Sequence, residues 1–480
     1  MPGFHEFPNP LAPTRLQGVS SSQDAGELAP SVWSMTARRD EHGELELGGV
    51  RASELLERFG SPLYVLDELD VRTRAADALR DFRAAFAAIG AEVDLHYASK
   101  ALLTADVARW MHEAGLGLDV ASAGEFEVAM AADFPPSEIG MHGNAKTDAQ
   151  LRRAIAAGIG TIIIDSLGEV DLVARIAAEL DRVQPVLVRI NVGIHAATHD
   201  FLATSHEDQK FGLTLDVARE AIDRIRAAGS LEFRGLHSHI GSSIYEPAGF
   251  GAAASRLMRF RAELLIGGPV PEVNLGGGFG IAYLPTDAAT PIADLAHGIA
   301  AEIERVCEEL GTTGELPRFT FEPGRSLVGT AGTTLYTVGA TKRVEVPAAD
   351  GAPASDRRYV SVDGGMSDNA RPALYGADYV ARLANRDSEA TPALSRVVGS
   401  HCESGDIVVH DEYLPSDVGV GDLLAVPVTG AYCFSLASHY NYAERPALVA
   451  VRDGEARVLV RRITIDDLLA ADTGVTGQER

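Results

Sequence analysis

A lysine at the end of an apolar strand is the residue of this chain best suited to covalent chemistry. Residues 92–100 read EVDLHYASK, a β-rich run that delivers Lys100 at its C-terminal end. Burial disfavours the charged amine and lowers its pKa, which makes a lysine nucleophilic. Such a lysine typically forms a Schiff base with an aldehyde cofactor, of which pyridoxal phosphate (PLP) is the common example. For an isolated YASK, a strand-end lysine that simply reaches solvent is the more common interpretation.

Two downstream segments offer the residue types that such a cofactor needs. One is the run of Gly276, Gly277 and Gly278, and the other is Glu322, Pro323, Gly324 and Arg325. Glycines let backbone N–H groups approach a phosphate closely. A carboxylate such as Glu322 keeps a pyridine nitrogen protonated, so that the ring accepts electrons. Arg325 can bind a phosphate or a carboxylate through two N–H groups, although each segment alone also fits an ordinary turn.

A histidine pair ends another β-rich run. In the sequence HSHIGS (237–242), alternation places His237 and His239 on one face of the strand. The pair could bind a metal, or one flat imidazole could stack on a cofactor ring while Ser242 donates to phosphate; a structural role is more common than either. The loop 195–212 carries three more histidines, without helical support: His195, His199 and His206. We expect no metal site in the chain.

Composition limits the class of protein. A chain of 480 residues with 46% hydrophobic and 23% charged residues predicts a globular protein of two domains. The formal net charge of −26 argues against nucleic acid or an anionic membrane as a partner. Three scattered cysteines indicate a reducing compartment, and the N-terminus has neither an apolar run nor a basic flank. We therefore expect a cytoplasmic protein.

The elements that position these residues follow an alternating pattern. Candidate strands lie at 92–100, 117–122, 139–143, 161–166, 185–191, 233–241, 272–279 and 318–324, separated by helical stretches such as the one that Gly229 ends. Eight such strands predict a (β/α)8 barrel, whose active site lies at the C-terminal strand ends. A doubly wound sheet is the main alternative, but it usually carries its glycine motif after the first strand.

After residue 330 the pattern changes to short strands separated by turns, including a hairpin around Asp453 and Gly454. This predicts an all-β domain, completed by an N-terminal strand for which the run 43–49 is the candidate. The predicted boundaries are a flexible arm at 1–30, a segment pairing with the β domain at 31–60, the PLP-binding barrel at 61–328 and the C-terminal β domain at 329–480.

The β domain contributes two loops with unusual composition. Residues 363–375 are too rich in glycine and polar groups to form a strand. In the segment 401–406, a thiol, Cys402, lies next to an acid, Glu403, and a cysteine in a polar loop is a candidate proton donor. Tyr432 adds a phenol at the end of a strand.

Taken in order, these motifs resemble the diaminopimelate decarboxylase family. They are YASK, HGNAK (142–146), GLHSHIGS, NLGGGFG, EPGR, DGGMSDNARPALYGA, CESGD and GAYCFSLASHYNYAERP, and they run from about residue 60 to 470. The family has the alanine-racemase-like fold (fold type III), a PLP-binding (β/α)8 barrel with a β domain. The resemblance implies a carboxy-lyase that converts meso-2,6-diaminopimelate to L-lysine and CO2, the last step of lysine biosynthesis.

The resemblance also implies residue roles. Cofactor-binding residues would be Lys100 as the Schiff-base lysine, His239 on the ring, Glu322 at the pyridine nitrogen, Ser242, Gly276, Gly277, Gly278, Gly324 and Arg325 around the phosphate, and Tyr432. Substrate-binding residues would be Arg325, Arg371, Tyr375, Glu403 and Tyr432. Lys100 and Cys402 would be catalytic, with Cys402 reprotonating the carbanion from the partner subunit, so a homodimer with shared active sites is implied.

The chain departs from the family pattern at Ser243, where glutamine is frequent, and at His439, where asparagine is usual. Alternative functions are a related decarboxylase of this fold, acting on ornithine, arginine or carboxynorspermidine, and an alanine racemase. A catalytically inactive PLP-binding regulator is a further alternative, but such proteins typically lose the lysine or the cysteine. A substrate with a second amino-acid centre needs both a buried cation and a buried anion, which Arg371 and Glu403 supply.

Overall fold

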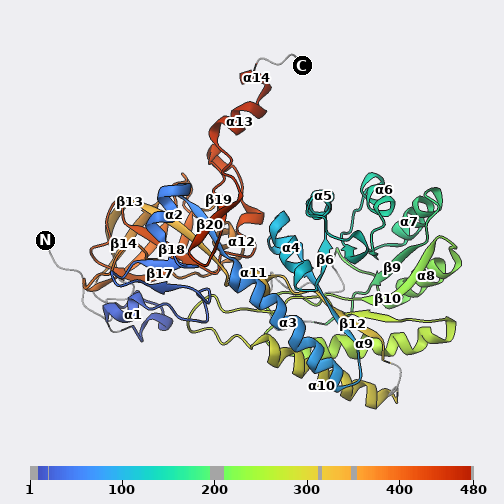
Figure 1. Ribbon diagram of the computed structural model, residues 1–480. Helices are drawn as coiled ribbons and strands as arrows, with labels where there is room; N and C mark the ends of the chain where they lie inside the picture. Colours follow the sequence, from blue (N-terminus) through green and yellow to red (C-terminus); the bar gives the residue numbers. More distant parts are fainter. Residues whose placement is uncertain (1–8, 20, 195–209, 312–315, 348–353, 477–480) are drawn as a thin grey trace. The chain divides into compact units, whose positions relative to one another are not determined.

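The structure, a computed structural model, describes residues 9–19, 21–194, 210–311, 316–347 and 354–476. The chain forms two compact units (Figure 1). We call Arg72–Ile281 with Ala289–Leu327 the barrel unit. Met1–Val71, Ala282–Ala288 and Val328–Arg480 form the second, which we call the β unit.

Eight parallel strands close the barrel. They are β5 (Val93–Ala98), β6 (Gly117–Val120), β7 (Ile139–Met141), β8 (Thr161–Ile164), β9 (Gln184–Arg189), β10 (Leu231–His237), β11 (Glu272–Asn274) and β12 (Arg318–Phe321). Neighbours in chain order pair with each other, and β12 pairs with β5 to close the ring. The predicted barrel is therefore confirmed and the doubly wound sheet is excluded. Most of the strands are shorter than predicted, so Lys100 and the three glycines lie in turns beyond the strand ends.

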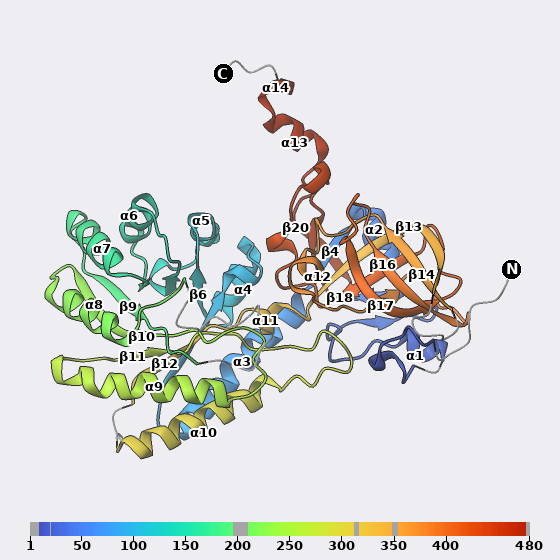
Figure 2. The same cartoon turned by 180° about the vertical axis from the view of Figure 1, so that it is seen from behind.

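Helices before and between these strands surround the barrel (Figures 1 and 2). They are α3 (Glu68–Ala88), α4 (Ala105–Glu113), α5 (Ala123–Ala131), α6 (Asp148–Ala157), α7 (Leu167–Glu179), α8 (Leu215–Ala227), α9 (Ala248–Leu264) and α10 (Ile292–Leu310). The four helices after β5, β6, β7 and β8 all begin at a Ser or Thr whose side chain accepts a backbone N–H of the first turn: Thr104, Ser122, Thr147 and Ser166. Such caps satisfy N–H groups that have no partner inside the helix, which fixes where each helix begins.

Alternation along β12 divides apolar from polar side chains. Phe319 and Phe321 face the helices, where Phe321 contacts Phe82 of α3 with ring centroids 4.8 Å apart. Thr320 and Glu322 point the other way, into the barrel, because successive side chains of a strand face opposite sides. The apolar layer between strands and helices thus holds the barrel together while the interior remains available for polar groups.

The β unit is built on a nine-stranded sheet. Its strands are β4 (Leu63–Asp67), β13 (Gly332–Val346), β14 (Ser355–Val362), β15 (Arg382–Leu383), β16 (Pro392–Val398), β17 (Ile407–Pro415), β18 (Leu423–Pro427), β19 (Ala447–Arg452) and β20 (Glu455–Val460). The long strand β13 is central. Its first half pairs with β4 and β18, and its second half pairs with β14.

Smaller elements complete the β unit. The strands β1 (Arg38–Arg39), β2 (Leu45–Leu47) and β3 (Val50–Arg51) form a separate three-stranded sheet. Its short helical turns and helices include η1 (Thr14–Leu16), α1 (Ser22–Gly26), α2 (Ala52–Phe59), α12 (Arg371–Tyr375), α13 (Ile465–Ala471) and α14 (Thr473–Thr476), while α11 (Arg325–Val328) follows β12 at the end of the barrel unit.

The all-β prediction is confirmed, with two differences in detail. The N-terminal strand that completes the large sheet is β4, whereas the predicted run 43–49 forms β2, whose Leu45 N–H donates to the Ala384 carbonyl at 2.8 Å. The strands β4 and β16 were not predicted. The predicted hairpin is confirmed: Asp453 and Gly454 both adopt positive φ, 53° and 82°, as a tight two-residue turn requires.

Within the described residues, no helix has the length and apolar character needed to cross a membrane.

Candidate active site

A cavity of about 260 Å3 lies in the barrel unit, lined by residues at the C-terminal ends of its strands. Its lining includes Lys100, His142, His239 and Glu322, which come from the turns after β5, β7, β10 and β12. Parallel strands of a closed barrel end at the same rim, so residues far apart in sequence converge there. The sequence prediction that Lys100, His239 and Glu322 meet at this rim is in agreement with the structure.

Lys100 lies in a helical turn, η2 (Ser99–Ala101), that follows β5 directly. Its side chain is exposed, which differs from the buried amine that the sequence predicts. The strand ends at Ala98, so the turn carries the lysine past the packed part of the barrel and to the wall of the cavity. The amine is therefore not enclosed by other side chains, and it can reach a molecule bound in the cavity.

His239 has a neutral, oriented ring. Burial lowers its pKa well below the usual 6.5, and the positive charge of Lys100 acts in the same direction. The backbone N–H of Gly277 donates to Nδ1 of His239 at 3.3 Å, which leaves the ring proton on Nε2. A neutral imidazole held by the backbone is suited to stacking on a flat ring.

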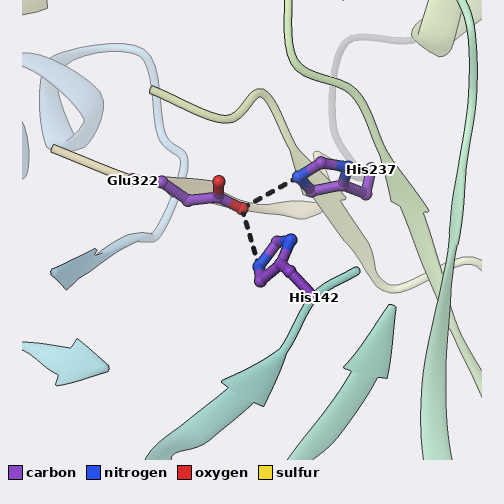
Figure 3. Close-up of side chains that lie close together, drawn as sticks. All are labelled: His142, His237 and Glu322. Atoms are coloured by element: carbon purple, nitrogen blue, oxygen red, sulfur yellow. Dashed lines mark hydrogen bonds and ion pairs between the residues drawn. The ribbon is translucent and has the colours of Figure 1, made fainter. Parts of the chain in front are cut away.

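Glu322 is held between two imidazoles, as Figure 3 shows. The Nε2 of His237 lies 2.9 Å from Glu322 Oε1, and the Nε2 of His142 lies 3.5 Å from the same oxygen. Burial by itself would raise the pKa of Glu322, but the two imidazoles outweigh it and hold that pKa well below 4.5. Glu322 is therefore an ionised carboxylate inside the barrel.

His237 and His142 explain why the carboxylate keeps its charge. Burial lowers the pKa of His237 to about 4, so its ring is neutral near pH 7 and donates from Nε2 to Glu322. His237 and His239 both line the cavity, as the alternation along the strand predicts, and His237 hydrogen-bonds to Glu322. The ligand-type atoms of His142, His237 and Glu322 lie within 4.8 Å of one another, a spacing that a cation could also use.

The three glycines are needed where the ends of β10, β11 and β12 come together. A Cβ on Gly277 would overlap the carbonyl oxygen of Glu322, and one on Gly278 would overlap that of Gly241. Gly276 and Gly278 also have φ angles of 69° and 108°, which other residues rarely adopt. The N–H of Gly276 donates to Asn274 at 2.8 Å, so part of this run serves the strand exit itself.

Ser242 and Arg325 meet on the same rim. An Nη2–H of Arg325 donates to Oγ of Ser242 at 3.2 Å, although 83 residues separate them. Arg325 is buried and follows Gly324 at the end of β12. A hydroxyl beside a guanidinium is a pair of groups that suits an oxyanion such as phosphate.

Arg371, in the β unit, is a buried guanidinium with aromatic neighbours. Its central carbon lies 4.9 Å from the ring centre of Tyr283 and 5.8 Å from that of Tyr432. Burial would lower its pKa, but the surrounding phenols raise it, so the group keeps its charge. Among the described residues it forms no ion pair with a carboxylate, and its Nε has no hydrogen-bond partner. A buried, charged guanidinium of this kind can bind the anionic group of a ligand.

Two tyrosines of the β unit are also among the predicted substrate-binding residues. Tyr375 ends the same short helix, α12, and its side chain is 48% exposed. Tyr432 has a φ of 62°, a strained value for a residue with a side chain, and such strain is concentrated at functional sites.

Cys402 and Glu403 lie in an exposed loop between β16 and β17. The thiol of Cys402 is free and exposed, whereas Cys307 and Cys433 are buried. Glu403 is also exposed. The loop is anchored by the buried Asp406, whose carboxylate accepts the backbone N–H groups of His401 at 2.8 Å and Met366 at 2.6 Å. This places a free thiol and an acid side by side on the surface of the β unit.

Sequence reasoning missed several residues of the site. His142, Asp119, Arg189 and Tyr283 line the cavity or contact a site residue but had been given no role. Asp119 had a usable signal, because it is a charged residue within the predicted strand 117–122. His195, His199 and His206 lie outside the described residues.

Comparisons with known proteins agree with this site. Residues 74–329 match the family model described as the pyridoxal-binding domain of pyridoxal-dependent decarboxylases. The diaminopimelate decarboxylase of Mycobacterium tuberculosis is 46% identical over 454 residues, 93% of this chain and 98% of that protein. That of Bacillus subtilis is 43% identical over 444 residues, 91% of this chain and 97% of that protein. The crystal structure of the M. jannaschii enzyme with L-lysine superposes with a TM-score of 0.81 at 32% identity, covering 92% and 98% of the two chains.

A barrel with a lysine, a neutral histidine and an ionised glutamate at its rim, together with a β unit, defines a PLP-dependent decarboxylase of the barrel class. Within that class, the match over nearly the whole chain is to one group of enzymes. The chain belongs to the diaminopimelate decarboxylase family.

The residues present fit PLP. The cavity offers an accessible amine, a flat neutral imidazole, an ionised carboxylate for a pyridine nitrogen, and the Ser242–Arg325 pair for an oxyanion. These are the groups that a phosphorylated aldehyde with a basic ring nitrogen needs, and PLP is the cofactor of this chain.

Proposed function

We propose that this protein decarboxylates meso-2,6-diaminopimelate to L-lysine and CO2, the last step of lysine biosynthesis, with PLP as its cofactor. One observation carries the choice of substrate: Arg371 is a buried guanidinium that forms no ion pair with a carboxylate among the described residues. A buried charge without a partner is costly, so the site is built for an anionic group of the substrate. A substrate with a second carboxylate satisfies it.

Bound PLP supplies an electron-accepting ring that stabilises the carbanion left when CO2 departs. Lys100 holds the cofactor covalently, His239 supports the ring face, and Glu322 keeps the ring nitrogen protonated. Ser242, Gly276, Gly277, Gly278, Gly324 and Arg325 surround the phosphate. The depressed pKa of Glu322 supports its part, because only an ionised carboxylate can pair with a protonated nitrogen.

The substrate is held by groups of both signs. Arg371 binds one carboxylate with help from Arg325 and Tyr375, and Glu403 binds the distal ammonium. Tyr432 contacts both cofactor and substrate, and its position 5.8 Å from the Arg371 guanidinium supports a place beside the carboxylate. An ornithine decarboxylase needs the acid but has no second carboxylate for such an arginine.

Cys402 donates the proton to the carbanion, and it does so in the active site of a partner subunit. An exposed thiol beside an exposed acid supports this, since a group that serves a neighbouring chain must lie on the surface. Exposed apolar side chains on β20 and the terminal helices, Val458, Ile465, Leu469 and Val475, are further surface that a homodimer could cover. We infer a cytoplasmic homodimer with shared active sites.

The test is a substrate panel. Purified protein with PLP is incubated separately with meso-diaminopimelate, ornithine, lysine and arginine, and CO2 release is followed. The proposal requires release from diaminopimelate at a rate far above that from the other three. Faster release from ornithine or arginine, or none from diaminopimelate with PLP bound, would contradict it.

A further inference from the structure

A chain of polar contacts crosses the interior of the barrel beneath Glu322. Nδ1 of His96, on β5, lies 3.2 Å from Asp119 Oδ1, on β6. The same carboxylate oxygen lies 3.4 Å from Nε2 of His142, just after β7, which in turn lies 3.5 Å from Glu322. Because β7 and β12 are three strands apart in the ring, this series spans the barrel rather than running along its wall.

Two glycines make room for this series. A Cβ on Gly117 would lie 2.6 Å from the ring of His96, and one on Gly140 would lie 2.5 Å from Asp119 Oδ1. Both distances are too short for real atoms, so neither position accepts even alanine without moving a member of the series. Barrel interiors are usually filled by bulky apolar residues, and here that volume is given to an imidazole and a carboxylate.

The series begins with an ion pair between His96 and Asp119. Burial alone would lower the pKa of His96, but the Asp119 carboxylate raises it to about 9, so the ring is a cation near pH 7. Burial and the nearby Glu322 raise the pKa of Asp119, while His142 and His96 lower it, and the net effect is a lowered value. The carboxylates of Asp119 and Glu322 thus both face the imidazole of His142. The cation at His96 neutralises the charge of Asp119.

We propose that His96 and Asp119 are positioning residues for the cofactor. Together they fix the ring of His142, and His142 with His237 fixes Glu322 where it receives the cofactor's ring nitrogen. Without the cation at His96, Asp119 is an unpaired buried carboxylate that repels Glu322 and competes for His142. The inference rests on the proposed function only in taking PLP as the ligand of Glu322.

The experiment compares PLP binding by full-length variants. Cofactor-free protein is titrated with PLP, and the dissociation constant is measured beside the melting temperature of the same cofactor-free sample. H96L should weaken PLP binding on the order of tenfold, as loss of an outer partner of a ligand-holding group typically does. H96Q, which keeps a polar side chain but no charge, should have a smaller effect in the same direction.

The double variant H96L/D119L distinguishes positioning from mere packing. It removes the unpaired carboxylate together with its cation, so PLP should bind more tightly to it than to H96L alone. E169Q is the control: Glu169 forms a more deeply buried ion pair with Lys146 at 2.8 Å in the same unit and does not line the cavity. It should alter the melting temperature but leave PLP affinity unchanged.

Equal PLP affinity for wild type, H96L and H96Q would overturn the proposal. The proposal would also be overturned if E169Q lost PLP affinity in the same proportion to its loss of melting temperature as the His96 variants do. If H96L does not fold, the same comparison of PLP affinity and melting temperature is made between H96Q and E169Q. A wild-type protein that does not bind PLP at all would instead contradict the proposed function.

Discussion

The candidate site residues of the two units differ in whether their ionisable groups have partners. In the barrel unit, Glu322, His237, Asp119 and His96 all have partners within the barrel, at separations of 2.9 to 3.5 Å. In the β unit, Arg371 is buried without a carboxylate, and Cys402 and Glu403 are exposed. The site residues of the barrel unit contact each other, whereas the buried Arg371 of the β unit has no carboxylate partner among the described residues.

This difference explains how one fold can keep a cofactor and vary its substrate. Groups that partner each other are insensitive to what enters the cavity, while an unpaired buried cation selects for an anion.

The largest effect is expected at Lys100. Lys100→Ala should abolish decarboxylation and leave no cofactor that borohydride fixes to the protein, because the amine that forms the covalent link is gone. Mass spectrometry of the reduced, digested protein locates the label. Lys342→Ala, an exposed lysine on β13, is the control and should behave as wild type. A label at one specific lysine in Lys100→Ala protein would show that the assignment is wrong.

A substantial effect is expected at Arg371. Arg371→Ala should weaken the interaction with diaminopimelate by about 2–5 kcal/mol, because a substrate carboxylate then lies in a desolvated site without its partner. Arg371→Lys should lose less, since it keeps the charge but not the planar fork. Steady-state kinetics on diaminopimelate measures both, and full activity of Arg371→Ala would exclude a role in substrate binding.

The smallest effect concerns stability and pH. His96 has a folded pKa of about 9 against 6.5 for an ordinary histidine, so the folded state binds the proton more tightly. Its stabilising contribution is complete below pH 6.5 and is lost as the pH rises to about 9, by up to about 3 kcal/mol. Denaturant unfolding of cofactor-free protein should show this decline, and His96→Gln should reduce it. If the free energy of unfolding declined with pH equally steeply in wild type and in His96→Gln, the assigned charge of His96 would be contradicted.

Much of the fold could be predicted from the sequence, because eight β-rich runs alternate with helical periodicity and parallel strands need such crossovers. The strand β4 escaped prediction because its fully buried run, Leu63–Asp67, shows no alternation. Lys100, His239 and Glu322 could be placed together because a barrel gathers its strand ends at one rim. The partners of Glu322 could not be predicted, because His142 lies 180 positions away from it in sequence. No local sequence pattern indicates a contact across the barrel.

The most direct test of the account's central claim is subunit complementation. If the barrel half of one chain works with Cys402 of another, inactive Lys100→Ala and Cys402→Ala proteins should regain activity when their subunits exchange. With random reassortment about half of the dimers are mixed, each with one intact site of two, so activity should approach about a quarter of wild type. No recovery after verified subunit exchange would contradict the claim, because Lys100 and Cys402 would then act within one chain.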